Sequence, residues 1–415
     1  MKSQFWLHHS GNFKNDVEIS LPLSKSISNR VLILEAISSG SIYSKKYSDS
    51  SDTNTLISCI KNINSTFLDA KDAGTTFRFL VALASLSDHE ITISGTTRMK
   101  KRPVKGLVEV LQNMGAEILY LEKKGFPPLK IKPPKNRLRT YSELKIHDTS
   151  SSQFISALML IAPVVKNGIH LTFPRFMPSY SYIEMTAEIL RQAEIDFELG
   201  DDFVKIPEQN LSEKKICIEI EKDWSSASYF FSMMACGSWE NIFLKGLSIK
   251  SIQRDTKIIE YFKPLGIAAE ENKEGIILRK VKPKTNAKLI FDFKDNPDLS
   301  LTVIVAYALN KIDIKVKGIE NLVIKESDRI ESLKLELRKI NVDFYKVGNF
   351  WQLQTAGLNI PKSIYLNTYN DHRIAMAFSV LAIHSRLEID NPAVVNKSFL
   401  GFWDQLTFLG LELNY

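Results

Sequence analysis

The sequence predicts an α/β protein of two domains, each built from three similar repeats around buried helices. Two observations predict this fold class. The chain of 415 residues is long enough for two hydrophobic cores, and two kinds of sequence element each recur six times along it. The composition, 44% hydrophobic and 24% charged, is that of an ordinary globular protein and excludes a disordered or fibrous one.

The first recurring element is a helical run that ends on a small or polar residue and leads into alternating apolar residues. Gly, Asn or Ala-Glu at that junction is typical of a helix C-terminus, and the alternation indicates a strand. The six copies begin near Thr53, Val108, Thr186, Ile258, Ser332 and Trp403.

The second recurring element is a polar opening followed by a helix that is apolar on every side, which predicts a buried helix. The six copies begin at Ser24, Ala73, Ser150, Trp224, Pro297 and Asp371. Together the two elements predict six repeats of roughly 70 residues, each with one buried helix, one amphipathic helix and several short strands.

The openings of the buried helices hold more polar residues than capping requires. A helix N-terminus offers free N–H groups and partial positive charge, which makes it an anion site. Taken singly, each opening also fits an ordinary cap with a neighbouring surface charge. Taken together, they predict a cleft for a ligand with more than one phosphate or carboxylate; the residues are Lys25, Ser26, Arg30, Gly74, Thr75, Thr76, Arg78, Ser150, Ser151, Ser152, Gln153, Asp371, His372 and Arg373.

Other classes of protein find little support. The net charge of +7 fits either an anionic ligand or a background property, and no charge run or aromatic-basic stripe indicates nucleic-acid binding. Three cysteines in apolar surroundings predict buried free thiols in a reducing compartment. The longest apolar stretch, 154–165, is too short to span a bilayer, and no signal peptide is visible, so we expect a soluble cytoplasmic protein. Motifs for ATP, NAD or metal binding are missing, so we expect no cofactor and no metal.

Eight motifs, in order, resemble the 5-enolpyruvylshikimate-3-phosphate (EPSP) synthase family along nearly the whole chain. They are LSKSISNR (23–30), DAGTTFR (72–78), TRMKKRP (97–103), SSSQF (150–154), DWSSASYF (223–230), IKESDR (324–329), DHRIAMA (371–377) and NKSF (396–399). The resemblance implies a two-domain inside-out α/β barrel, each domain with three β-α-β-α-β-β repeats around a buried helix bundle. It also implies one domain from residues 1–21 and 222–415, a second from 22–221, and an active site in the cleft between them.

The resemblance further implies the reaction. The enolpyruvyl group of phosphoenolpyruvate moves to the 5-hydroxyl of shikimate 3-phosphate and phosphate is released, on the chorismate route to aromatic amino acids. No nucleic-acid or membrane partner is implied, and we expect a monomer. Many members of the family are inhibited by glyphosate at the phosphoenolpyruvate site, which makes this chain an expected glyphosate target.

Residues that match the family motifs inherit expected roles. Asp298 resembles the base at the 5-hydroxyl, Glu326 the carboxyl group that moves a proton at the enol methylene, and Lys25 the lysine that touches both substrates. Shikimate 3-phosphate is expected to meet Lys25, Ser26, Arg30, Ser151, Ser152, Gln153, Ser179, Tyr182, Asp298, Asn321 and Lys325. Phosphoenolpyruvate is expected to meet Lys25, Gly74, Arg98, Gln153, Arg329, Arg373 and Lys397.

The chemistry of the substrates agrees with these roles. Phosphoenolpyruvate carries a phosphate and a carboxylate, and arginine matches both with two-pronged hydrogen bonds. An unactivated alcohol must lose its proton as C3 gains one, which requires two carboxyl groups in opposite protonation states. We expect Lys25 and Lys325 to keep Asp298 ionised. At Gly74, we expect the lack of a side chain to let backbone N–H groups approach an anion.

Some positions depart from the family pattern, and two rival functions stay open. Leu23, Asp72, Phe79, Tyr180 and Ser181 replace commoner residues in loops or behind the site, which bears on affinity more than on reaction type.

The first rival is the sister enzyme that uses UDP-N-acetylglucosamine, although Lys25-Ser26 and Ser151-Ser152 argue against it. The second is a catalytically inactive binding protein on the same fold, against which the presence of Asp298, Glu326 and Lys25 argues.

Overall fold

The chain divides into two compact units. The computed structural model describes residues 5–11, 13–140, 142–148, 151–175, 177–212, 215–283 and 289–414. Unit 1 comprises Met1–Pro22 and Glu221–Tyr415, and unit 2 comprises Leu23–Ile220.

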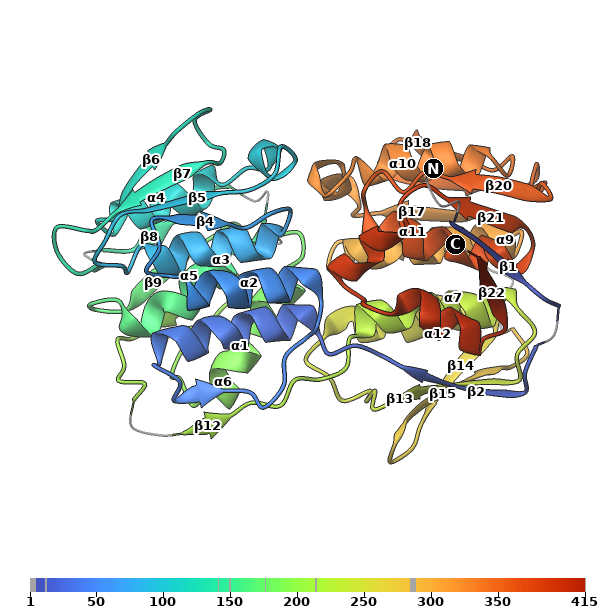
Figure 1. Ribbon diagram of the computed structural model, residues 1–415, viewed down its shortest axis with the longest axis horizontal. Helices are drawn as coiled ribbons and strands as arrows, with labels where there is room; N and C mark the ends of the chain where they lie inside the picture. The colour runs from blue at the N-terminus through green and yellow to red at the C-terminus, as the bar shows by residue number, and fades with distance from the viewer. Residues whose placement is uncertain are drawn as a thin grey trace. The chain divides into compact units, whose positions relative to one another are not determined.

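Unit 2 contains six helices, and its strands form two four-stranded sheets and one two-stranded sheet within the described residues (Figure 1). The helices are α1 (Lys25–Ile37), α2 (Ser51–Lys61), α3 (Gly74–Ala84), α4 (Lys105–Asn113), α5 (Ser152–Ile161) and α6 (Ser181–Gln192). The strands are β3 (Ile42–Tyr43), β4 (Phe67–Asp69), β5 (Ile91–Ser94), β6 (Glu117–Tyr120), β7 (Leu129–Lys132), β8 (Leu144–Lys145), β9 (Ile169–Thr172), β10 (Glu198–Leu199), β11 (Phe203–Ile206) and β12 (Ile216–Cys217).

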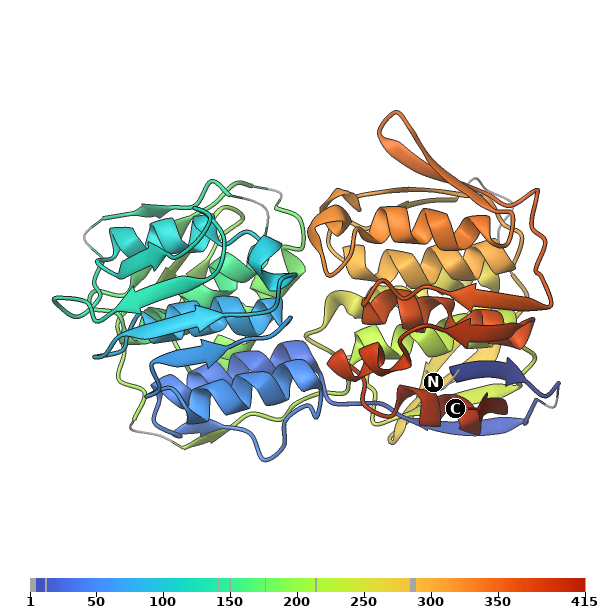
Figure 2. The same ribbon diagram turned by 45° about the horizontal axis from the view of Figure 1, so that its top comes forward.

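Unit 1 is built in the same way and has three four-stranded sheets in its described part (Figure 2). The helices are α7 (Trp224–Cys236), α8 (Ile258–Phe262), α9 (Ser300–Leu309), α10 (Arg329–Arg338), α11 (His372–Phe378) and α12 (Phe402–Phe408). The strands are β1 (Phe5–His9), β2 (Asp16–Ser20), β13 (Asn241–Lys245), β14 (Ile267–Glu271), β15 (Gly275–Lys280), β16 (Leu289–Asp292), β17 (Ile314–Lys317), β18 (Asp343–Val347), β19 (Phe350–Gln354), β20 (Ser363–Leu366), β21 (Arg386–Ile389) and β22 (Leu411–Asn414).

The six apolar elements form the six buried helices α1, α3, α5, α7, α9 and α11, and the six amphipathic elements form the helices between them. Within each unit the three buried helices pack against one another, as the sequence predicts. In α9 every residue from Ser300 to Ala308 is buried, which is what an apolar surface all round the helix requires. The predicted α/β fold with buried helices is therefore confirmed.

A single pairing pattern runs through the five four-stranded sheets. In the sheet of β4 to β7, β4 and β5 flank the buried helix α3 and pair in parallel. The strands β6 and β7 form a hairpin after α4, and β7 pairs antiparallel with β5. The same order of parallel and antiparallel pairs recurs in the other four sheets. Each sheet is therefore one β-α-β-α-β-β repeat, whose parallel strands need a helical crossover between them.

The last repeat of unit 1 takes its final strand from the other end of the chain. The N-terminal strand β1 pairs antiparallel with β21 and with β22. It occupies the position that the second hairpin strand holds in the other repeats. The N-terminal segment therefore belongs to the same unit as the C-terminal half.

The first repeat of unit 2 is shorter than the others. Residues 62–66 link α2 directly to β4, so the strand after α2 opens the next repeat instead of starting a hairpin. Its sheet contains only β12 and β3, paired in parallel. The Ser38 hydroxyl accepts a hydrogen bond from the Ile42 N–H at 3.0 Å, and the Tyr47 hydroxyl accepts one from the Ser44 N–H at 3.0 Å. These hydroxyl groups therefore bind backbone N–H groups in and next to β3 that no further strand among the described residues pairs with.

Two details differ from the sequence-based expectation. The amphipathic helix α8 stops at Phe262 and continues as a 3₁₀ turn at Lys263–Leu265, because Pro264 has no N–H to continue an α-helix. The prediction of buried cysteines holds for Cys59, but Cys236 is only partly buried and Cys217 is exposed. Cys217 ends the short strand β12 of the two-stranded sheet, where neighbouring structure covers less of it.

Within the described residues, no helix is both long and apolar enough to cross a membrane.

Candidate functional site

The predicted site residues of unit 2 lie at the N-terminal ends of its buried helices. Lys25 is the first residue of α1, and Gly74 is the first residue of α3. Neither helix has a side-chain cap, since Ser24 and Ala73 provide none. The helix α5 differs, because its N-cap Ser151 accepts a hydrogen bond from the Gln153 N–H at 3.3 Å. Ser150, which opens the third predicted helix, lies outside the described residues.

Lys25 has an acidic partner that the sequence analysis missed. Its Nζ lies 3.0 Å from Oδ2 of Asp52, in the first turn of α2. The Asp52 side chain is 10% exposed, and the Asp52 carbonyl accepts a hydrogen bond from the Thr76 hydroxyl of α3. Asp52 therefore links the starts of three helices, α1 through the ion pair and α3 through its carbonyl. The only sequence signal was an acidic residue in the first turn of an amphipathic helix, which is common.

Arg30 is buried and binds the residues that surround it. Its Nε donates to the Thr186 hydroxyl at 2.8 Å, its Nη1 to the Ser26 carbonyl at 2.8 Å, and its Nη2 to the Tyr182 carbonyl at 3.2 Å. Burial lowers the pKa of Arg30 to about 10, so it stays protonated at neutral pH. Arg30 thereby holds Ser26 and Tyr182, two further predicted site residues, around one guanidinium. Ser179 lies one turn before Tyr182, buried and with a φ of 61°.

Gln153 connects α5 with α3. Its Oε1 accepts a hydrogen bond from Arg78 Nη1 at 2.9 Å, and its Nε2 donates to the Thr75 hydroxyl at 2.9 Å. Arg78 also donates to the Gly74 carbonyl at 3.1 Å. Gln153 and Gly74, predicted from separate motifs, are therefore brought together, and Ser152 is buried beside Gln153.

Arg98 stands apart from this arrangement. It is exposed at the start of the 3₁₀ turn Met99–Lys101, whereas Arg102, at the end of that turn, is buried. The sequence analysis singled out Arg98 and passed over Arg102, although both belong to the motif TRMKKRP.

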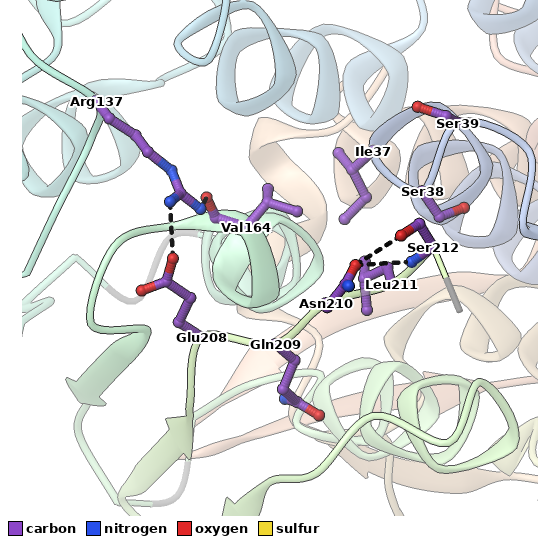
Figure 3. A pocket seen from close by; sticks show the side chains of 10 residues that line it. All are labelled: Ile37, Ser38, Ser39, Arg137, Val164, Glu208, Gln209, Asn210, Leu211 and Ser212. Atoms are coloured by element: carbon purple, nitrogen blue, oxygen red, sulfur yellow. Dashed lines mark hydrogen bonds and ion pairs between the residues drawn. The ribbon is translucent and has the colours of Figure 1, made fainter. Parts of the chain in front are cut away.

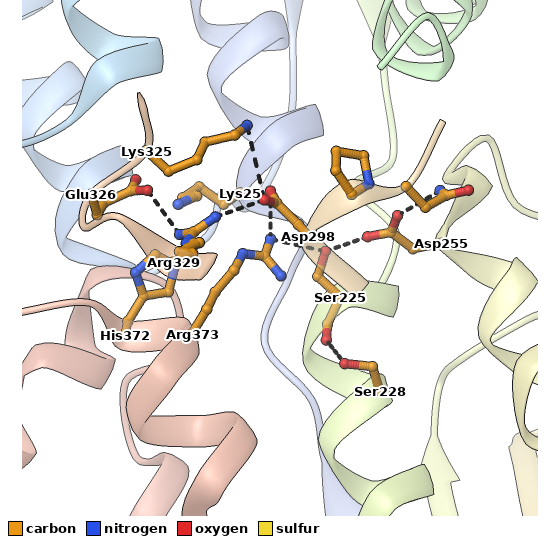
Figure 4. A network of polar contacts seen from close by, with 12 residues as sticks. Lys25, Ser225, Ser228, Asp255, Asp298, Lys325, Glu326, Arg329, His372 and Arg373 are labelled. Atoms are coloured by element: carbon orange, nitrogen blue, oxygen red, sulfur yellow. Dashed lines mark hydrogen bonds and ion pairs between the residues drawn. The ribbon is translucent and has the colours of Figure 1, made fainter. Parts of the chain in front are cut away.

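Unit 1 contains a dense ionic network, shown in Figure 4. Arg329, 1% exposed at the start of α10, donates to Oδ1 of Asp298 at 2.6 Å and to Oε2 of Glu326 at 2.8 Å. It also binds both oxygens of Asp371, at 2.7 and 3.1 Å. One buried guanidinium therefore joins three carboxylates. Glu326 and Arg329 are therefore not a surface pair, since their side chains are only 14% and 1% exposed.

Three more cations complete the network. Arg373 Nη2 lies 3.4 Å from Oδ2 of Asp298, Lys325 Nζ lies 3.9 Å from its Oδ1, and Lys397 Nζ lies 3.6 Å from Oε1 of Glu326. We call Asp298, Lys325, Glu326, Arg329, Arg373 and Lys397 the unit 1 network. Every member was predicted from the sequence. Asn321, also predicted, lies in the 3₁₀ turn Glu320–Ile324, and its Oδ1 is buried with no hydrogen-bond partner among the described residues.

The cations control the charge of Asp298. Burial alone raises its pKa, but Arg373, Lys325 and Arg329 outweigh burial and hold the pKa well below its usual range. Asp298 is therefore ionised at any physiological pH. We expected Lys25 and Lys325 in this role; Lys325 acts together with two arginines, whereas the ion pair of Lys25 is with Asp52.

Asp371 connects two of these cations. It caps α11 by accepting a hydrogen bond from the Arg373 N–H at 2.9 Å while its carboxylate binds the Arg329 side chain. Three residues that the sequence analysis missed lie behind Arg373. Its Nη2 is 3.4 Å from the Ser225 hydroxyl, which donates to Asp255, and Asp255 accepts from Asn296 Nδ2 at 3.0 Å. These residues come from three separate segments; Ser225 lies in the motif DWSSASYF, whereas Asp255 and Asn296 lie outside the eight motifs.

A cavity in unit 2, of about 390 Å³, lies away from the predicted residues (Figure 3). It sits beside Ile37 at the C-terminal end of α1, and the ion pair of Arg137 and Glu208, at 2.7 Å, lines it. No predicted site residue contributes to its lining. In the part of the chain that the structure describes, no group of three or more His, Cys, Asp or Glu residues is placed to hold a metal ion.

Comparisons with known proteins agree with the fold and with the motifs. The family model of EPSP synthase (3-phosphoshikimate 1-carboxyvinyltransferase) matches residues 62–406. The 3-phosphoshikimate 1-carboxyvinyltransferase of Bacteroides fragilis is 38% identical over 403 residues, which cover 95% of each chain. That of Buchnera aphidicola subsp. Cinara cedri is 31% identical and covers 93% of each chain.

Solved structures share the fold. An EPSP synthase from Acinetobacter baumannii has a TM-score of 0.76 at 20% identity, covering 99% of this chain and 100% of the other. The enolpyruvyl transferase NikO from Streptomyces tendae has a TM-score of 0.73 at 12% identity, covering 99% of both chains. These solved structures support the fold alone, whereas the family model and the sequence relatives support membership of the family. The chain belongs to the EPSP synthase family.

Proposed function

We propose that this protein transfers the enolpyruvyl group of phosphoenolpyruvate to the 5-hydroxyl of shikimate 3-phosphate and releases phosphate. The observation that carries the proposal is the unit 1 network. Two carboxylates stand among four cations in it, and the buried Arg329 touches both carboxylates. That composition meets the two requirements of the reaction, binding of a small polyanion and proton transfer at two atoms.

The roles of the carboxylates follow from the reaction. The 5-hydroxyl oxygen attacks C2 of phosphoenolpyruvate, and Asp298, ionised in the free protein, takes the hydroxyl proton. Glu326 delivers a proton to C3, which becomes a methyl group in the tetrahedral intermediate. When the C2–O bond to phosphate breaks, the methyl group returns a proton to Glu326 and the vinyl group re-forms, while Asp298 passes the hydroxyl proton to the leaving phosphate. Protons and charges balance without any further reactant.

The cations serve the phosphate and the carboxylate of phosphoenolpyruvate. Arg329, Arg373 and Lys397 form ion pairs with carboxylates of the protein. An arriving anion offers them new partners and leaves Asp298 with fewer cations around it. The pKa of Asp298 then moves upward from its depressed value, which makes it a stronger base when the substrate is present.

Unit 2 supplies most of the groups for shikimate 3-phosphate. Ser151 and Ser152 begin α5, where hydroxyl and N–H groups together suit a phosphate. Lys25 adds a cation, and Arg30 holds Ser26 and Tyr182 in place for the ring and its carboxylate. We propose that these residues and the unit 1 network bind the same pair of substrates.

Phosphate release tests the proposal directly. We expect release from phosphoenolpyruvate with shikimate 3-phosphate as acceptor and none with UDP-N-acetylglucosamine. Turnover with the sugar nucleotide alone would instead identify the sister enzyme. Binding of both substrates without any turnover would identify an inactive binding protein.

A further inference from the structure

Gly74 leaves room for the head of a buried arginine. A Cβ built on Gly74 would have Nη1, Cζ and Nη2 of Arg102 all within 2.5 Å. Such a separation is far below van der Waals contact, so an alanine and the guanidinium cannot both keep these positions. The φ of Gly74 does not lie in the left-handed region, so backbone strain is not the reason for glycine here. The space that we expected to be open to an anion is occupied by Arg102.

Arg102 is in an unusual place for a cation. Arg102 is only 8% exposed, and its side chain packs against Gly74, the first residue of α3. The guanidinium of Arg102 therefore lies at the positive end of the α3 helix dipole. Arg78, 3% exposed, donates to the Gly74 carbonyl from the same helix and adds a second guanidinium. A fold gains from concentrating positive charge in this way when an anion binds nearby.

We propose that Arg102 is a specificity-determining residue for phosphoenolpyruvate, and that position 74 must be glycine because a side chain there would displace the Arg102 guanidinium. The proposal rests on the proposed function, which places Gly74 at the phosphoenolpyruvate site. A guanidinium presents paired N–H groups to a phosphate or carboxylate, a geometry that lysine does not reproduce. The atoms that a Cβ at position 74 would meet are the guanidinium of Arg102, the far end of a flexible side chain. In Gly74→Ala we therefore expect the backbone of α3 to stay in place and the Arg102 side chain to move.

A kinetic double-mutant cycle tests this coupling. The four proteins are the wild type, Gly74→Ala, Arg102→Met and the double variant; Met keeps the apolar stem and removes the charged head. We expect each single variant to raise KM for phosphoenolpyruvate tenfold or more, with a much smaller change in KM for shikimate 3-phosphate. The double variant is expected to match Arg102→Met alone. Fold-changes that multiply, or an Arg102→Met variant with an unchanged KM, would overturn the proposal.

A stability cycle on the same four proteins separates this inference from the proposed function. Gly74→Ala is expected to lower the urea midpoint in the wild type and to have little effect in the Arg102→Met background, where no guanidinium remains to be displaced. This readout requires no activity. A wild type without turnover, together with a coupled stability cycle, would reject the proposed function and keep the Gly74–Arg102 contact. Additive effects on the midpoint would reject the contact itself.

Gly200 provides the matched control. A Cβ there would also meet the end of a side chain, the ring of Phe203, but on the hairpin of β10 and β11. We expect Gly200→Ala to lower the urea midpoint to the same extent in the wild type and in the Arg102→Met background, and to leave KM for phosphoenolpyruvate unchanged. Arg102→Lys adds the conservative comparison, and we expect it to recover less than half of the lost affinity. Full recovery with lysine would show that charge alone matters, which contradicts a role for the guanidinium geometry.

Discussion

At Asp298, one carboxylate is surrounded by three cations and sits at the head of a buried helix. Arg329 is within 2.6 Å, and Arg373 and Lys325 are within 4 Å. Because burial penalises an isolated charge, the aspartate and its cations depend on one another, and removing one member leaves the others uncompensated. Two predictions follow from this residue.

The first prediction concerns catalysis. Asp298→Asn keeps the size of the side chain and removes its ability to accept a proton. We expect kcat to fall by roughly 100-fold or more, as for a lost general base, while the affinity for shikimate 3-phosphate changes little. Steady-state kinetics and calorimetric titration of the same variant measure both quantities. Turnover within a few-fold of the wild type would show that another group takes the proton.

The second prediction concerns pH. Because the folded-state pKa of Asp298 is depressed, its ion pairs stabilise the protein above the ordinary aspartate pKa of about 3.9 and lose that contribution as the pH falls below it. We expect Asp298→Asn to have a lower urea midpoint than the wild type at pH 7, and the two midpoints to converge as the pH falls from about 4 toward the depressed pKa. A constant difference across that range would show that Asp298 is not held ionised by its neighbours.

At the scale of an element, the turn that leads into α11 carries backbone strain. Tyr369 and Asn370 both have a φ of 54°, an uncommon value for residues with side chains, and they immediately precede Asp371. The Tyr369 hydroxyl donates to the buried Glu336 at 2.7 Å, and Asn391 donates to the Asn370 side chain at 2.8 Å. These contacts hold the strained turn and therefore position the start of α11.

The third prediction tests that turn. Tyr369→Phe removes one hydrogen bond from the turn, which we expect to cost about 1 kcal/mol of stability. We also expect KM for phosphoenolpyruvate to rise several-fold, because Arg373 is three residues after Asn370. Tyr345→Phe is the control, since Tyr345 is exposed on β18 and its hydroxyl donates to Gln354 of β19. Equal kinetics for the two variants would mean that the turn does not position Arg373.

At the scale of the whole molecule, each unit repeats one β-α-β-α-β-β plan and each presents polar groups at the starts of its buried helices. We propose that both sets of groups bind the same substrates, so ligand binding is expected to stabilise both units. The fourth prediction is that shikimate 3-phosphate slows amide exchange at the starts of α1 and α5 in unit 2 and, with phosphoenolpyruvate also present, at the starts of α9 and α11 in unit 1. The C-terminal end of α1, beside the cavity of Figure 3, is the internal control. Protection confined to one unit under both conditions would show that the substrates contact that unit alone.

From the sequence we predicted the repeats, the two kinds of helix and, through the family resemblance, every member of the unit 1 network. Periodicity in apolar residues reports burial directly, so α9 could be recognised without coordinates. Most of the network residues stand in short motifs, such as IKESDR and DHRIAMA. IKESDR alone places three of them within five consecutive residues.

The surroundings of those residues became visible only in the folded protein. The pairing of Lys25 with Asp52, the chain of Ser225, Asp255 and Asn296 behind Arg373, and the missing hairpin of the first repeat each depend on segments that are distant in sequence. The sequence also suggested that Gly74 leaves an opening, whereas folding fills that space with Arg102. Local pattern determines whether a side chain is buried, but the packing of separate segments determines which atoms it meets, and those atoms set its charge and its freedom to move.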